Sequence, residues 1–269
     1  MQKLVSIMFI GAALLTVILC SCGASQTEEE TTDNSDYIIE KIEKSSPVTS
    51  GNLITKTKTD DDGNLNVEYY DNDGNLVETY IWDDDDIVEH TIMSYTSSDM
   101  LQSKEIIGSD GLTSTVTSYM YDTDNTVSQT TINNFEDGLL QVSTIYDSNN
   151  DITSYTLYYY NENSKLEKLE KYDGDDNLLE YSTCEYNDSD NPEKRTSFDS
   201  DGNVTSYTEY CYNSMNLISE ERYYDAGGNL ENYCEISYYD SGCVQSRTYF
   251  DSEGNQTSQD TYEDTSEDS

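Results

Sequence analysis

The chain has 269 residues and carries 13 basic against 55 acidic side chains, a formal net charge of -42. Leucine, isoleucine, valine and phenylalanine together number 50, about 19% of the chain, which is too few to fill a thick aliphatic core in so charged a protein. The charge also excludes nucleic-acid recognition as a main activity, because binding to phosphate backbones requires clustered lysine and arginine.

The first 21 residues have the pattern of an export signal. Lys3 supplies a positive start, and residues 4–19 form an apolar run that is short for a membrane span. The run leads into Leu19-Cys20-Ser21-Cys22-Gly23, which resembles the bacterial lipobox. That resemblance implies cleavage before Cys22 and lipidation of its thiol. Cys20 is the rival position, although the Leu19 before it is larger than the pattern accepts. A plain secretory signal with an incidental cysteine is the other reading.

The lipobox resemblance implies a lipid-anchored protein on the extracytoplasmic face of a bacterial cell membrane. Two acyl chains are needed for stable residence in a membrane. An anionic membrane would repel this acidic chain, so the acyl anchor and not electrostatic attraction must provide the membrane binding. We expect four segments: a signal peptide at 1–21, a lipidated, acidic, flexible tether at 22–49, a repeat domain at 50–262 and an acidic tail at 263–269.

An internal repeat of 26 residues organises the repeat domain. Four gap-free copies begin at Thr153, Leu179, Thr205 and Glu231, and about eight copies, the earlier ones with more drift, fill residues 50–262. Tyrosine recurs at the third position, as Tyr155, Tyr181, Tyr207 and Tyr233. It recurs again at the eighth, as Tyr160, Tyr186, Tyr212 and Tyr238. Apolar residues hold the fourteenth position, as Leu166, Pro192, Ile218 and Val244, and aromatic residues the twentieth, as Tyr172, Phe198, Tyr224 and Phe250.

Each copy contains two aromatic residues that precede a polar turn, so the basic unit is one strand and one turn. In turns such as Tyr224-Asp225-Ala226-Gly227-Gly228-Asn229-Leu230, aspartate can accept backbone N–H bonds and glycine or asparagine can adopt a left-handed conformation. Tyrosine, threonine, isoleucine and valine suit the strands between the turns. The sequence therefore predicts an all-β fold, an elongated antiparallel meander of about sixteen strands built from about eight 26-residue repeats.

Strand alternation predicts which side chains share a face. Counted through the repeat, the even positions six, eight, fourteen and twenty carry the apolar and aromatic columns and should form the buried face. The tyrosines at the third position would then form a ladder on the more polar face. This ladder, Tyr155, Tyr181, Tyr207 and Tyr233, is the candidate binding surface.

The turns resemble the YD, or RHS, repeat family, whose signature is Tyr-Asp-x-x-Gly-(Arg or Asn)-Leu. Residues 70–76 and 224–230 match every fixed position, and 172–178 lacks only the glycine. The resemblance implies a rolled or spiralling β-sheet scaffold on a bacterial surface. It does not carry over the toxin-enclosing role of large family members, because the period here is 26 residues where the family runs nearer to about 20, and no effector domain follows Tyr262. MORN-like hairpin repeats are an alternative kinship.

We predict no catalytic residue, cofactor or metal site. His90, the single histidine, stands near no distinctive serine or cysteine motif and is expected to be a strand-surface residue. No Cys/His cluster has zinc spacing. The turns at 60–64, 71–75 and 199–203 concentrate oxygen ligands, but glycine stands fourth where a calcium loop of the EF-hand type places it sixth, so solvated turns that bind Ca²⁺ weakly at most are expected.

Four cysteines follow the signal region: Cys184, Cys211, Cys234 and Cys243. The first three lie in corresponding strands of successive copies, with another strand between each pair. Their Cα atoms should be about 10 Å apart, beyond disulfide reach, so mainly free or packed thiols are expected.

The favoured hypothesis is a non-enzymatic repeat lipoprotein that acts in surface interaction or as an envelope scaffold, with a surface protein or a glycan as partner and no nucleic acid. The alternative is a carbohydrate- or cell-wall-binding module, because tyrosine ladders can stack on sugar rings. A secreted hydrolase, which would need two close carboxylates in a pocket, is the third hypothesis.

Overall fold

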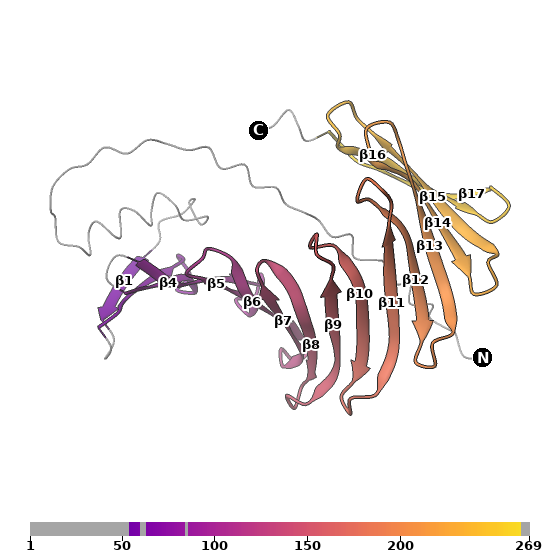
Figure 1. Cartoon of the computed structure of the whole chain (residues 1–269). Helices are drawn as coiled ribbons and strands as arrows, with labels where there is room; N and C mark the ends of the chain where they lie inside the picture. Colours follow the sequence, from indigo (N-terminus) through magenta and orange to yellow (C-terminus); the bar gives the residue numbers. More distant parts are fainter. Residues whose placement is uncertain (1–53, 60–62, 84–85, 265–269) are drawn as a thin grey trace.

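A computed structural model describes residues 54–59, 63–83 and 86–264. Within these residues seventeen strands form one sheet, in which each strand pairs antiparallel with its neighbours in the chain. The strands lie side by side along an open, curved sheet, from β1 at the indigo end to β17 at the yellow end (Figure 1). The predicted all-β antiparallel meander is confirmed.

The strands are six to ten residues long. The first eight are β1 (Ile54–Thr59), β2 (Leu65–Tyr70), β3 (Leu76–Asp83), β4 (Asp86–Tyr95), β5 (Leu101–Gly108), β6 (Thr113–Tyr121), β7 (Val127–Glu136) and β8 (Leu139–Asp147). The other nine are β9 (Ile152–Tyr160), β10 (Leu166–Asp173), β11 (Leu178–Tyr186), β12 (Pro192–Asp199), β13 (Val204–Tyr212), β14 (Ile218–Asp225), β15 (Leu230–Tyr238), β16 (Val244–Asp251) and β17 (Gln256–Thr261).

The strand count is one higher than the sequence predicts, because β17 begins a further copy of the repeat after the four gap-free ones. The predicted signal peptide, Cys22 and the predicted tether lie outside the described residues. In the described part no helix is present that could cross a membrane.

Most turns share one five-residue geometry. At Asp199 the backbone N–H donates to the Asn203 carbonyl, and the Gly202 N–H donates back to the Asp199 carbonyl, at 2.9 and 3.1 Å. The Asp199 carboxylate accepts the N–H groups of Asp201 and Asn203, at 3.0 and 2.8 Å. The fourth turn residue has a positive φ, +84° at Gly202, which glycine adopts without steric cost. The predicted combination of Asx-type aspartate and left-handed residue is confirmed at this turn.

A register shift of one residue accompanies these turns and decides which columns share a face. Between β9 and β10 the shift lies between Leu166 and Lys168, and beyond it Tyr155 stands opposite Tyr172. A bulge of this kind adds one residue to one strand, so the odd positions of one strand share a face with the even positions of the next. The sequence placed position twenty on the face of the other even positions, and this prediction was wrong: it shares a face with position three.

We call the two sides of the sheet over β9–β16 the stack face and the opposite face. The stack face holds the aromatic residues of positions three and twenty together, not on separate sides. The opposite face holds position six, namely Tyr158, Cys184, Tyr210 and Ile236. Ile236 is 7% exposed, and burial is the main cause that raises the pKa values of Tyr158, Cys184 and Tyr210. The position-six residues are therefore half-buried, and Ile236 is buried, which agrees with the side of the sheet predicted for them.

Tyrosines at strand ends tie neighbouring strands together. The Tyr186 hydroxyl, at the end of β11, donates to the carbonyl of Leu166, the first residue of β10, at 2.8 Å. The same bond recurs from Tyr95 to Leu76, Tyr121 to Leu101, Tyr160 to Leu140, Tyr212 to Pro192 and Tyr238 to Ile218, at 2.6 to 2.8 Å. These bonds satisfy backbone carbonyls at the first or second residue of a strand, and they explain the tyrosine column at position eight.

Deep burial is confined to a few places. The largest buried cluster is Val67, Tyr69, Tyr80 and Trp82 in β2 and β3, each at most 3% exposed. Elsewhere most aromatic side chains are half-buried, because a single sheet layer gives them neighbours on adjacent strands only. The low aliphatic content of the sequence fits this architecture.

We expect Tyr212→Phe to lower the free energy of unfolding by about 1 kcal/mol, because it leaves the Pro192 carbonyl without its phenol donor. Urea unfolding followed by circular dichroism measures the change. Tyr262→Phe, at an exposed position beyond β17, is the control and should leave the midpoint unchanged. Equal stability of the two variants would contradict the role of the tyrosine bond.

A pH-dependent contribution is expected from the turn aspartates. The amide and backbone N–H of Asn203 lower the pKa of Asp199, so its ionised form stabilises the fold above its unfolded-state pKa. This contribution is lost as the pH falls through the lowered value, below about 4. Asp199→Asn should be less stable than Asp201→Asn at pH 7, and the difference should vanish at low pH. Each variant removes one negative charge, so a difference that persists at low pH would contradict the assignment.

Candidate functional site

The four candidate tyrosines each stack on the aromatic residue directly opposite in the next strand. The ring centroids of Tyr181 and Phe198 are 4.5 Å apart and the rings are inclined by 8°. The corresponding pairs are Tyr155 with Tyr172 at 5.0 Å, Tyr207 with Tyr224 at 4.6 Å and Tyr233 with Phe250 at 4.6 Å. The structure therefore brings the predicted ladder into four parallel aromatic pairs, which form the main feature of the stack face.

Lysine covers the other side of two of these rings. The Lys168 ammonium on β10 lies 5.0 Å from the Tyr181 ring centroid, whereas Phe198 packs from β12. The Lys194 ammonium lies 3.8 Å from the Tyr207 centroid, opposite Tyr224. Such cation–π contacts add to the stacking energy. Both faces of Tyr181 and Tyr207 are thus occupied by the protein itself, so neither ring offers a free platform for a sugar.

The hydroxyls of the ladder tyrosines lie at the turns. A Cβ atom on Gly202, Gly228 or Gly254 would lie 3.5 to 3.7 Å from the hydroxyl of Tyr181, Tyr207 or Tyr233, respectively. In the remaining copy the Tyr155 hydroxyl donates to Asp176 at 2.9 Å. The ladder therefore packs along the strands as far as the turns. Its role in ligand binding stays a prediction.

A second cluster surrounds Glu170 in β10, on the stack face. Its carboxylate accepts the Tyr159 hydroxyl at 2.8 Å and the Tyr172 hydroxyl at 2.9 Å, and it pairs with the Lys168 ammonium at 2.6 Å. The Lys168 hydrogen bond is the main cause that lowers the pKa of Glu170, and the bond to Glu170 raises the pKa of Tyr159 to about 12. Glu170 is therefore ionised and Tyr159 protonated at neutral pH.

An open hollow of about 610 Å³ lies beside this cluster. The residues that line it are Tyr159, Glu167, Lys168, Glu170, Thr183, Cys184 and Glu185. The Tyr159 side chain is 42% exposed, in contrast to the ladder tyrosines, which are half-buried. The sequence pattern did not single out Tyr159. The available signal was that position seven holds tyrosine in one copy but Glu185, Cys211 and Ser237 in the following ones.

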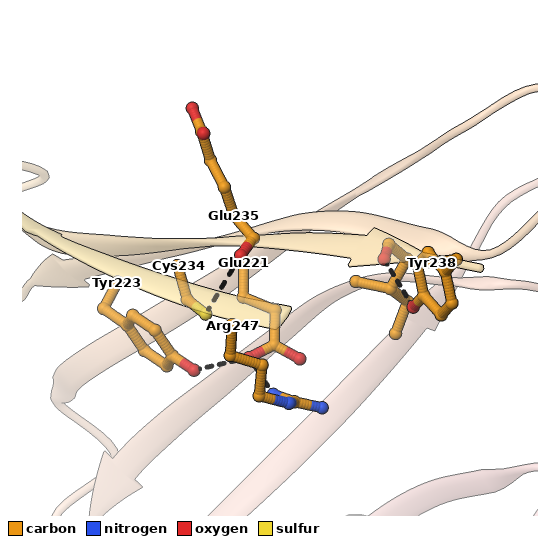
Figure 2. Close-up of polar contacts among 7 residues, drawn as sticks. Glu221, Tyr223, Cys234, Glu235, Tyr238 and Arg247 are labelled. Atoms are coloured by element: carbon orange, nitrogen blue, oxygen red, sulfur yellow. Dashed lines mark hydrogen bonds and ion pairs between the residues drawn. The ribbon is translucent and has the colours of Figure 1, made fainter. Parts of the chain in front are cut away.

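The opposite face carries a polar group at β14–β16 (Figure 2). The Tyr223 hydroxyl donates to Glu221 at 2.7 Å, and the Arg247 guanidinium lies 3.8 Å from the same carboxylate oxygen. Cys234 stands directly opposite Glu221 across the strands and is fully buried. Burial, with a smaller contribution from the Glu221 charge, raises the pKa of Cys234 to about 11. This thiol is protonated and therefore a poor nucleophile at neutral pH.

All four cysteines in the described residues are free, which agrees with the prediction. Cys184 and Cys234 lie on the opposite face, whereas Cys211, which stands across from Glu220, lies on the stack face. Cys243 is in the turn between β15 and β16.

His90 in β4 is more buried than the sequence suggested. Its Nε2 atom lies 2.7 Å from the carboxylate of Glu78, which is fully buried, and its ring stacks on Tyr80 at 4.1 Å. The Tyr80 hydroxyl donates to the same carboxylate oxygen at 2.7 Å. The expectation of a strand-surface histidine was wrong, because Glu78 and Tyr80 on the neighbouring strand enclose it. Among the described residues no group of three or more histidine, cysteine or acidic side chains is placed to hold a metal ion.

No protein-family model matches the sequence, and no curated protein matches it. Among solved structures, one similar chain comes from the crystal structure of TcdB2-TccC3-TEV, with 12% identity and a TM-score of 0.30. That match covers 80% of this chain and 15% of the other. A porin-like protein from Bacteroides uniformis has 12% identity and a TM-score of 0.33, covering 77% of this chain and 92% of its own. Scores this low support no inference about function.

We expect Cys234 to resist alkylation in the folded protein, because its thiol is buried and its pKa is raised. Iodoacetamide at pH 8 followed by peptide mass spectrometry should label Cys243, which is partly exposed in a turn, well before Cys234. In urea the two should react at similar rates. Equally fast labelling of both in the native protein would contradict the packing of the opposite face.

Proposed function

We propose that the protein is a non-enzymatic lipoprotein, anchored by Cys22 on the extracytoplasmic face of a bacterial cell membrane. The repeat sheet would act there as a surface interaction element or envelope scaffold. Support for the location comes from the export signal and from the lipobox-like residues 19–23. The acidic segment that follows would hold the sheet away from the membrane, since anionic headgroups repel it.

The observation that favours a scaffold role is that the residues which recur in successive copies of the repeat make their contacts within the sheet itself. The tyrosines of position three stack on their neighbours, those of position eight bond to strand ends, and the turn aspartates close the turns. The repeated residues thus build an extended surface, and residues that differ between copies are left to contact a partner.

The partner expected for such a surface is another surface protein or a glycan. An extended single sheet presents two broad faces and many turns, which suits contact over a large area. The net charge of -42 disfavours nucleic acid and other polyanions as partners.

Cys22→Ala should abolish incorporation of radiolabelled palmitate and release the protein from the membrane fraction, because the acyl chains provide the membrane affinity. Cys20→Ala is the matched control and should be labelled and anchored like the wild type. Metabolic labelling and fractionation in a bacterial host that processes lipoproteins measure both. Labelling that survives Cys22→Ala, or is lost only in Cys20→Ala, would overturn the assignment of the anchor.

A further inference from the structure

We propose that the hollow beside Tyr159 is a binding site for a neutral saccharide, with one sugar ring stacked on the part of the Tyr159 ring that stays exposed beside the Lys168 ammonium, which lies 6.0 Å from the ring centroid. The inference deepens the proposed surface-interaction role by naming a ligand class and a site. It moves the sugar-binding surface away from the ladder of Tyr155, Tyr181, Tyr207 and Tyr233.

The first support is the exposure and fixed position of Tyr159. The Tyr159 ring is 42% exposed and is not free to rotate away. Its hydroxyl is held by Glu170 at 2.8 Å, and Glu170 is itself held by Lys168 and Tyr172. The ring is therefore presented to the hollow in one orientation, and little conformational entropy is lost on binding.

The second support is that the residues around Tyr159 differ from those at the same positions in the following copies of the repeat. The stack-face cluster combines Tyr159 of position seven with Lys168 and Glu170 of positions sixteen and eighteen. The next copy has Glu185, Lys194 and Thr196 at these positions, and the copy after that has Cys211, Glu220 and Arg222. The sheet forms with each of these sets, so the fold does not require the tyrosine cluster. A specific residue set that the architecture does not need is suited to recognition.

The third support is the chemistry of the lining. Saccharide recognition needs an apolar ring face for the C–H side of the sugar and polar groups at its edge for the hydroxyls. Tyr159 supplies the ring, while Glu167 and Glu185, which are exposed, and Thr183 supply acceptors or donors around it. The hollow of about 610 Å³ lies within the size range of small-molecule sites.

Charge excludes an anionic ligand. Glu167, Glu170 and Glu185 face the hollow against the single cation Lys168, which is already paired with Glu170. The remainder of the chain adds a large negative field. An anionic polysaccharide would be repelled, whereas the hydroxyls of a neutral sugar can donate to the free carboxylate oxygens.

The test measures saccharide binding by the purified full chain in a detergent that has no sugar headgroup. Isothermal titration with cellohexaose, maltohexaose and chitohexaose, and with an oligogalacturonate as the anionic comparator, should detect at least one neutral ligand and not the anionic one. Tyr159→Ala should weaken that binding by about tenfold or more, and Tyr159→Phe, which keeps the ring, by no more than about threefold.

Two further variants separate binding from folding. Tyr262→Ala removes a tyrosine of similar exposure, 45%, that lies outside the hollow, and it should bind like the wild type. Thr183→Arg places a long side chain in the hollow without removing Tyr159, and it should also lose binding. Circular dichroism and the unfolding midpoint confirm that each variant is folded.

Failure to bind any of the neutral saccharides, preference for oligogalacturonate, or unchanged binding by folded Tyr159→Ala would each overturn the inference. None of these results bears on lipidation, because binding is measured on purified protein. Failure of the anchoring experiment would in turn leave the saccharide result intact, so the two proposals fail separately.

Discussion

A sheet of one layer has no second layer against which to bury its side chains, and this constraint governs the structure. Stabilisation must come from contacts between adjacent strands, repeated along the sheet. Tyrosine meets the requirement well, because its ring packs against a neighbour while its hydroxyl reaches a backbone carbonyl or a turn. The aromatic pairs of positions three and twenty and the terminal hydroxyl bonds of position eight are two uses of the same residue. Aliphatic residues, which serve a thick core, are correspondingly scarce.

The acidic composition follows partly from the turns. Aspartate begins many of them because its carboxylate accepts two backbone N–H groups, as at Asp199. Asparagine takes the same place at Asn187 and Asn213 with the same bonds, so the geometry needs the side-chain oxygen and not the charge. The turn would therefore form without the charge, which strengthens the N–H bonds at positions such as Asp199 and adds solubility and repulsion. It also limits the ligands and surfaces that the protein can approach.

In a repeat protein, residues that recur in every copy and residues that occur in one copy have different explanations. Columns that recur in every copy are explained by the contacts that hold the strands together. The clusters at Tyr159, Lys168 and Glu170, at Glu221 and Arg247, and at Glu78 and His90 occur once each in the described residues. In the Glu221–Arg247 and Glu78–His90 clusters the polar groups are partly or fully buried and pair with one another, so these clusters are suited to stabilising the fold. Only the first presents an exposed aromatic ring beside an open hollow.

The sequence by itself determined the all-β antiparallel meander, the 26-residue period, the turn chemistry and the free thiols. Each of these depends on local residue patterns or on the spacing between strands, which a periodic sequence displays directly. Only the tertiary structure decided that Tyr155 and Tyr172 share a face, that His90 meets Glu78 and that Tyr159 borders a hollow. One extra residue in a bulge reverses the face of every position beyond it, and such a residue is not distinguished in the sequence from any other. Contacts across strands depend on that register, so they emerge only once the strands are paired.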